Sequence, residues 1–253
     1  MPTFVDVLLD AAELGFFVAC AYAVLYAYAR HRSAAWTARF RQRRLALLVV
    51  LTLAMSAIKV IEDVLGKESG RLDEALLWLI RGQVPAALNG FFAGLTLSGS
   101  ATALVSATAG AVVALLIFGH RFEAALIGAS SITSALLVYV LKALIGRARP
   151  DLWQAQSSQW YWGSSFPSGH TLSTAAFATA AALCVARLYP RWATSAMVGA
   201  LWWSCAVALS RLVLGAHWPT DVLAALCLGV LIPLLFSAAF EWYGRRPHTT
   251  EPS

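Results

Sequence analysis

The sequence is dominated by seven runs of apolar residues, separated by short or more polar connections. A membrane hydrocarbon core about 30 Å thick requires about 20 consecutive apolar residues per helix. The runs that meet this length are residues 8–28, 45–65, 100–118, 124–145, 171–188, 193–212 and 222–240. The first is the weakest, because Asp10 and Glu13 lie in its opening turns, so six spans is the alternative count. We therefore predict an all-α, polytopic transmembrane helix bundle of six to seven spans.

The composition of the chain requires a lipid environment. Hydrophobic residues make up 59% of it and charged residues 13%, and the mean hydropathy is +0.68. A soluble domain carries about 25% charged residues, so this chain has too little polar surface to cover itself. Its net charge of +6 lies in the connections between apolar runs. That distribution argues for the bilayer as a partner and against nucleic acid.

Arginine is concentrated in alternate connections and in the tail. These residues are Arg30, Arg32, Arg39, Arg41, Arg43, Arg44, Arg121, Arg187, Arg191, Arg245 and Arg246. Because Lys and Arg are enriched in cytoplasmic connections, we expect this face to be cytoplasmic and the opposite helix ends to lie outside. An alanine- and arginine-rich chain favours a bacterial source. We thus expect a multi-pass protein of the cytoplasmic (inner) membrane.

A less apolar stretch, residues 71–99, separates the second and third runs. Charged residues there alternate with leucine and tryptophan, a pattern typical of a helix that lies in the membrane interface. We divide the chain accordingly into N-terminal spans with an interfacial helix (1–89), a core helical bundle (90–240) and a cytoplasmic tail (241–253).

Three polar motifs fall at helix ends on the predicted outer face. They are Lys142 to Pro150, with Arg149 before the proline, then Pro167-Ser168-Gly169-His170, and finally Ser210-Arg211 with His217 and Asp221. Since all three lie on one side of the membrane, they can converge on a single site at the periplasmic or extracellular face.

The motifs carry the groups that a phosphate requires. Lys142, Arg149 and Arg211 supply three cations where membrane topology disfavours them, and arginine binds phosphoryl oxygens through two parallel hydrogen bonds. Ser168 and Gly169 open a predicted helix, whose first amides and dipole favour an anion. We therefore expect a phosphoryl group as the ligand. No Cys or His cluster has metal-site spacing, so no metal or cofactor is expected.

Two of the five histidines lie on the outer face. His31, His120 and His248 are predicted at the cytoplasmic edge or in the tail, where solvation explains them. His170 and His217 each lie in a motif with cations, which favours a catalytic role. Asp221 follows His217 by four residues, within reach on one helical turn. A carboxylate on Nδ1–H would leave Nε2 free as a nucleophile, and Asp221 also suits the positive end of the last helix.

These motifs resemble the three signatures of the type 2 phosphatidic acid phosphatase superfamily. The resemblance rests on Lys, six residues, Arg-Pro; on Pro-Ser-Gly-His; and on Ser-Arg, five residues, His, three residues, Asp, all in the family's order. It covers roughly residues 90–240. Family members commonly have six spans, so a seventh would be a departure at the amino terminus.

The resemblance implies a membrane lipid phosphatase that works through a phosphohistidine. His217 would attack phosphorus, Asp221 would orient and balance it, and His170 would protonate the leaving oxygen. The implied phosphate-binding groups are Lys142, Arg149, Ser168, the Gly169 amide and Arg211. No metal is implied. Arg147 lies off the signature and is a candidate of second rank.

The sequence leaves several alternatives open. The lipid phosphate could be undecaprenyl diphosphate, phosphatidylglycerol phosphate, phosphatidic acid or lipid A, and the acceptor could be a second lipid, which would make a phosphotransferase. A transporter or channel is a competing class, based on Lys59, Glu62 and Asp63 within a span, although snorkelling explains them. Vanadate-dependent haloperoxidases share the constellation in soluble chains, and the apolar spans argue against them. The oligomeric state stays open.

Overall fold

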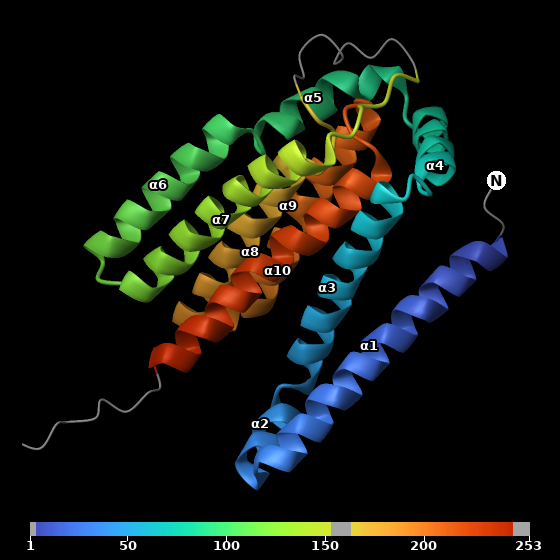
Figure 1. Ribbon diagram of the computed structural model, residues 1–253. Helices are drawn as coiled ribbons and strands as arrows, with labels where there is room; N and C mark the ends of the chain where they lie inside the picture. Colours follow the sequence, from blue (N-terminus) through green and yellow to red (C-terminus); the bar gives the residue numbers. More distant parts are fainter. Residues whose placement is uncertain (1–3, 153–162, 245–253) are drawn as a thin grey trace, which may run out of the picture.

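The computed structural model describes residues 4–152 and 163–244, and this part of the chain consists of helices and connections without a strand (Figure 1). The elements are α1 (Phe4–Arg32), α2 (Ala34–Gln42), α3 (Arg44–Leu65), α4 (Gly70–Gln83), η1 (Ala86–Leu88), α5 (Asn89–Leu97), α6 (Ala101–Ile117), α7 (Arg121–Ile145), α8 (Gly169–Leu188), η2 (Pro190–Trp192), α9 (Ala193–Val213) and α10 (Pro219–Gly244). Arg245, Arg246 and His248 lie outside the described residues. The predicted all-α class is confirmed.

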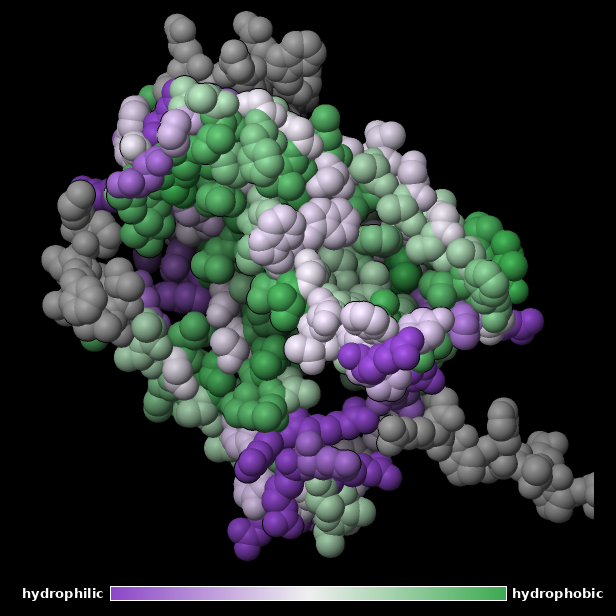
Figure 2. Space-filling model, turned by 180° about the vertical axis from the view of Figure 1, so that it is seen from behind, coloured by the Kyte–Doolittle hydropathy of each residue, from purple (hydrophilic) through white to green (hydrophobic). Residues whose placement is uncertain are grey.

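Seven helical segments of the described chain are long and apolar enough to cross a membrane. Five correspond to single long helices, α1, α3, α7, α8 and α10. The third combines η1, α5 and α6 into Ala86–Ile117, and the sixth combines η2 and α9 into Pro190–Val213. Each predicted run overlaps one of these segments. Figure 2 shows the apolar band that results, with hydrophilic residues gathered at the end that carries α2.

The stretch 71–99 differs from the single interfacial helix that the sequence predicts. It divides into α4, η1 and α5, and α4 packs beside α9 and α10. The break falls at Val84, whose backbone is extended (φ −104°, ψ 115°), because the residue before a proline is disfavoured in the helical region. The chain can therefore fold back over the ends of the spans.

α8 lies at the centre of the bundle, where it packs against α7, α9 and α10. Ala175 and Ala176 on this helix are fully buried. A β-carbon built on Gly229 of α10 would lie 2.6 Å from both the Ala175 β-carbon and the Leu172 carbonyl oxygen. In lipid, small residues let helix backbones approach this closely. The spacing of α8 and α10 therefore depends on Gly229.

Gly229→Ala is expected to destabilise the protein by about 1–3 kcal/mol, the usual effect of overpacking. The conflict involves a backbone oxygen, so no side-chain rotation relieves it. Gly110→Ala in α6 is the control, because nothing lies within 4 Å of its β-carbon. Thermal unfolding in detergent should place only Gly229→Ala below the wild type. Equal stability of the two variants would contradict the close approach.

Candidate active site

The three polar motifs meet at one end of the bundle, where α7 ends, α8 begins and α9 connects to α10 (Figure 1). Gly146 ends α7 in the left-handed conformation (φ 61°), which turns the chain away from the helix. The Ser165 amide donates a hydrogen bond of 2.7 Å to the Arg147 carbonyl. That bond joins the two described ends of a loop whose residues 153–162 are outside the described part of the chain.

His217 lies in the short connection between α9 and α10 and is 2% exposed. Gly215 precedes it with a φ of 64°, a left-handed conformation that glycine adopts without strain. The two ring nitrogens of His217 face different groups. Nδ1 lies 3.4 Å from Asp221 Oδ2 and 3.4 Å from Ser165 Oγ, and Nε2 lies 3.3 Å from Arg149 Nη1. The predicted proximity of His217 and Asp221 is confirmed, although 3.4 Å is a long hydrogen bond.

The Asp221 carboxylate is fully buried and accepts hydrogen bonds on both oxygens. Arg147 Nη1 donates to Oδ1 at 2.7 Å. The Trp218 amide donates to Oδ2 at 2.9 Å, and the Ser165 hydroxyl also donates to Oδ2. Because Trp218 immediately precedes α10, the amide bond also satisfies a free donor at the start of that helix. Asp221 is thus fixed independently of His217.

Arg149 is held by backbone carbonyls next to the histidine. Its Nη1 donates to the Ala216 carbonyl at 2.7 Å, and its Nε donates to the Gly163 carbonyl at 3.2 Å. These bonds direct the guanidinium towards Nε2 of His217, the nitrogen that the sequence predicts as nucleophile. A phosphoryl oxygen bound to Arg149 would therefore lie beside that nitrogen.

The remaining predicted cations and His170 lie at the same place. Arg211 is fully buried and donates to Thr96 Oγ1 of α5 at 2.8 Å. Lys142 donates to the Ser164 carbonyl. Arg211, Arg149 and Lys142, together with the His217 ring, are close enough to act electrostatically on His170. The structure thus brings both histidines and all three cations together.

Ser168 and Gly169 lie at the start of α8, as predicted, but the Ser168 hydroxyl has a local partner. Its Oγ lies 3.0 Å from Thr171 Oγ1, and its amide donates to the Asp221 carbonyl at 3.3 Å. Gly169 is the first residue of the helix. Since the first amides of a helix have no acceptor within it, the α8 terminus remains suited to a phosphoryl oxygen.

Burial strongly affects the protonation of His217. It lowers the pKa of His217 from 6.5 to about 4; the carboxylate of Asp221 opposes this shift, and the charges of Arg211 and Arg149 add to it. The imidazole is therefore neutral at pH 7 and carries a lone pair on one nitrogen. With the proton on Nδ1, facing Asp221, that lone pair is on Nε2.

Sequence reasoning missed a second carboxylate in the site. Asp73 of α4 is fully buried and accepts hydrogen bonds from Arg147 Nη2 at 2.5 Å, the Thr220 amide at 2.9 Å and the Thr220 hydroxyl at 2.7 Å. Arg147 therefore bridges Asp73 and Asp221, and it also contacts Ser69 Oγ at 3.2 Å. Its side chain is directed at carboxylates rather than at the Nε2 side of His217. No spacing rule links Asp73 to Arg147, which lies 74 residues later along the chain.

Two of the three charged residues that favoured a transporter, Lys59 and Asp63, pair with one another. Lys59 Nζ lies 3.2 Å from Asp63, 3.6 Å from Glu13 and 3.8 Å from Asp10. These contacts join α1 to α3. They give the cluster a structural role, so solute transport gains no support from it.

This arrangement defines a helical membrane protein with a cationic, histidine-containing site at its helix ends. Residues 123–245 match the model of the PAP2 superfamily. All three motifs lie within this match, and the family resemblance is confirmed for these residues.

Two curated relatives are similar to part of the chain. The chain is 37% identical over 118 residues to lipid A 1-phosphatase of Rhizobium johnstonii. The matched segment covers 44% of this chain and 45% of the relative. It is also 37% identical over 94 residues to phosphatidylglycerophosphatase B of Escherichia coli. That matched segment covers 37% of this chain and 32% of the relative. The chain thus matches less than half the length of these relatives.

Two solved structures have the same fold. The transmembrane PAP2 type phosphatidylglycerolphosphate phosphatase from Bacillus subtilis superposes with a TM-score of 0.69 at 24% identity, covering 78% of this chain and 98% of that one. Aquifex aeolicus LpxE superposes with a TM-score of 0.54 at 21% identity, covering 66% of this chain and 95% of that one.

Asp73→Asn is expected to destabilise the protein by about 3 kcal/mol, because removing one partner of a buried ion pair leaves the other uncompensated. An amide would also direct N–H groups at the Arg147 and Thr220 donors. Glu74→Gln, at the neighbouring exposed position, is the control and should unfold like the wild type. Thermal unfolding in detergent measures both, and similar transitions for the two variants would show that the Asp73 contacts contribute little.

Proposed function

We propose that the chain is a metal-independent lipid phosphatase whose nucleophile is His217. The observation that carries the proposal is the placement of a buried, neutral imidazole with Asp221 near one nitrogen and the Arg149 guanidinium near the other. That geometry suits in-line attack on a phosphoryl group bound by arginine. The names of the curated relatives support the same class.

In the first step, Nε2 of His217 forms a bond to phosphorus while the bond from phosphorus to the leaving oxygen breaks. His170 gives a proton to that oxygen; the negative charge of the bound phosphate would favour the protonated form of His170, which the surrounding cations otherwise oppose. Asp221 balances the charge that develops on the His217 ring. In the second step His170 accepts a proton from water, whose oxygen attacks phosphorus and releases His217 and inorganic phosphate.

The cations supply the charge stabilisation that phosphoryl transfer requires. Lys142, Arg149 and Arg211 would bind the phosphoryl oxygens, together with the Gly169 amide at the start of α8. Arg147 is neutralised by two carboxylates, so Lys142, Arg149 and Arg211, rather than Arg147, are the groups we assign to the phosphate dianion. The Ser168 hydroxyl would join them after turning from Thr171.

The substrate class we propose is a phosphomonoester or pyrophosphate on a lipid. A site at helix ends beside the hydrocarbon region can receive a headgroup whose chains stay in the bilayer. Lipid A and phosphatidylglycerol phosphate gain support from the relatives, while undecaprenyl diphosphate and phosphatidic acid fit the same chemistry. The arginine-rich connections lie at the helix ends opposite the histidine site, and their charge favours a cytoplasmic position for those ends. The histidine site would then lie on the periplasmic or extracellular side of an inner membrane.

His217→Ala is expected to lower phosphate release from a lipid phosphate by more than about 10³-fold, since losing a covalent nucleophile has effects of this size. His31→Ala is the matched control, because His31 is exposed at the far end of α1. Release of inorganic phosphate by the purified chain across the four candidate lipids measures both variants. Full activity of His217→Ala would exclude the mechanism.

In the pH profile of kcat/KM, the acidic limb is expected near pH 4 rather than near 6.5, the ordinary pKa of histidine. Burial lowers the pKa of His217, so its imidazole stays neutral and nucleophilic until the pH falls through about 4. The profile must be corrected for ionisation of the substrate phosphate. A corrected limb at 6.5 or above would contradict a buried nucleophile.

The acceptor is tested by adding a second lipid to the same assay. Water as acceptor predicts one free phosphate for each lipid phosphate consumed, whether or not the second lipid is present. A phosphotransferase would instead place the phosphoryl group on the added lipid and release less free phosphate.

A further inference from the structure

A cavity lies at the opposite end of the bundle from the histidine site. Its volume is about 770 Å³, and α1, α2, α3 and α10 all contribute to its lining. Asp221 and Trp242 lie near opposite ends of α10, and 21 residues of helix at 1.5 Å per residue separate them by about 30 Å. The cavity is therefore distinct from the candidate active site.

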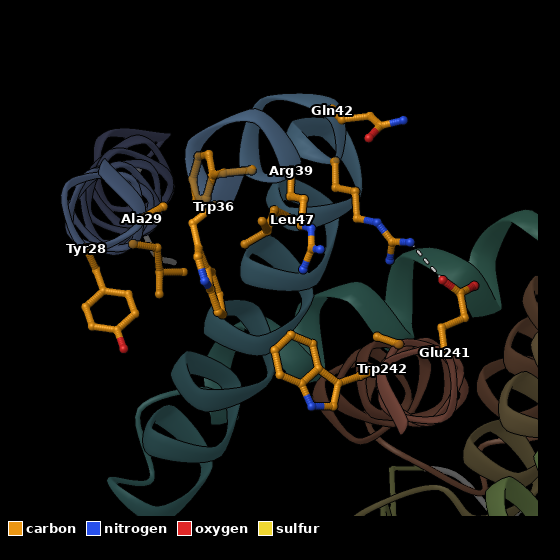
Figure 3. Close-up of a pocket in the computed structure, with 12 residues that line it drawn as sticks. Tyr28, Ala29, Trp36, Arg39, Gln42, Leu47, Glu241 and Trp242 are labelled. Carbon is orange, nitrogen blue, oxygen red and sulfur yellow. Dashed lines mark hydrogen bonds and ion pairs between the residues drawn. The ribbon is translucent and has the colours of Figure 1, made fainter. Parts of the chain in front are cut away.

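The cavity has aromatic walls and an arginine at its mouth (Figure 3). Trp36 of α2 and Trp242 of α10 face one another with ring centroids 5.8 Å apart, and Arg39 points from α2 into the space beside them. Leu25 of α1 and Leu47 of α3 complete apolar walls. Such a lining accepts a ligand that is apolar along most of its length and polar at one end.

The charges around the cavity select the polar end of the ligand. Arg43 pairs with Glu241 at 2.8 Å, so the one carboxylate among the described lining residues already has a cation. Among the described residues, the Arg39 guanidinium pairs with no carboxylate, and it is exposed. Further arginines surround it in the first connection, so the local potential is positive. An anion is the complementary group.

The position of the cavity relates it to the bilayer. Besides residues of α2, its lining comes from the last turns of the spans Leu9–Arg32 and Pro219–Trp242 and from the beginning of Arg44–Leu65. Tryptophan and arginine at span ends lie at headgroup level. A ligand with its charged end at Arg39 would therefore place its apolar part along the spans, at the depth of the hydrocarbon.

We propose that this cavity is a binding site for one anionic phospholipid, with its phosphate on Arg39 and its acyl chains between α1 and α10. Basic pockets between transmembrane helices are suited to anionic headgroups, and cavities of about 300–1,000 Å³ hold small ligands. The lipid joins the α1–α2 pair to α10, next to the Arg43–Glu241 ion pair. It is a structural ligand and takes no part in the reaction at His217.

The test uses the full chain, purified in non-ionic detergent and depleted of lipid. Phosphatidylglycerol and phosphatidylcholine with the same acyl chains are added in turn, and native mass spectrometry counts the lipids that stay bound. Arg39→Gln removes the cation at the cavity. Arg41→Gln removes a neighbouring arginine of α2 that does not line it, and is the matched control.

Wild type and Arg41→Gln are expected to retain one phosphatidylglycerol more tightly than phosphatidylcholine. Arg39→Gln should bind it about fivefold more weakly, the effect of one arginine on an anionic lipid. Leu25→Trp, which fills the cavity without changing charge, should lower occupancy as well. The active site contributes equally in all of these variants, so it does not obscure the difference.

Two results would overturn the proposal. Equal weakening by Arg39→Gln and Arg41→Gln would mean that the arginines attract lipid as a diffuse patch. Equal retention of phosphatidylcholine and phosphatidylglycerol would mean that the cavity is an apolar gap without a headgroup site. Thermal unfolding of each lipid-depleted variant verifies that it is folded.

Discussion

The buried carboxylate of Asp221 is the group on which the rest of the site depends. A charge removed from water has a large cost unless hydrogen bonds and an opposite charge compensate it. Arg147, Ser165 and the Trp218 amide provide that compensation. These groups come from the end of α7, from the segment before α8 and from the start of α10. Satisfying one carboxylate therefore fixes three chain segments relative to one another.

The same requirement extends the site into the amino-terminal part of the chain. Arg147 has a second carboxylate partner, Asp73, which comes from α4 and also binds the backbone of Thr220 at the start of α10. α4 thereby covers the helix ends from a region that the PAP2 match does not include. The division of the chain at residue 89 stays a prediction, but these contacts cross it. We infer that the amino-terminal part supports the site as well as anchoring the chain.

Much of this could be predicted from sequence, because lipid imposes simple rules. Helix length follows from bilayer thickness, and all seven predicted runs overlap spans in the structure. Placement of the three motifs on one side brought His170, His217 and the cations together as expected. The break at Val84 and the partition into α4 and α5 were missed, because local backbone preference before Pro85 does not alter the hydrophobic pattern. The bonds from Arg147 and Ser165 to Asp221 were missed because they depend on tertiary contacts, and the Asp73 to Arg147 pair joins residues that share no motif.

We propose that phosphorus is bound covalently to His217 during turnover. To test this bond, the purified chain is mixed with a lipid carrying a ³²P-labelled phosphate, the reaction is stopped with alkali within milliseconds, and the labelled peptide is mapped by mass spectrometry. An acid-labile, alkali-stable label on His217, absent from His217→Gln, is expected. Label on another residue, or turnover at a normal rate in His217→Gln, would contradict it.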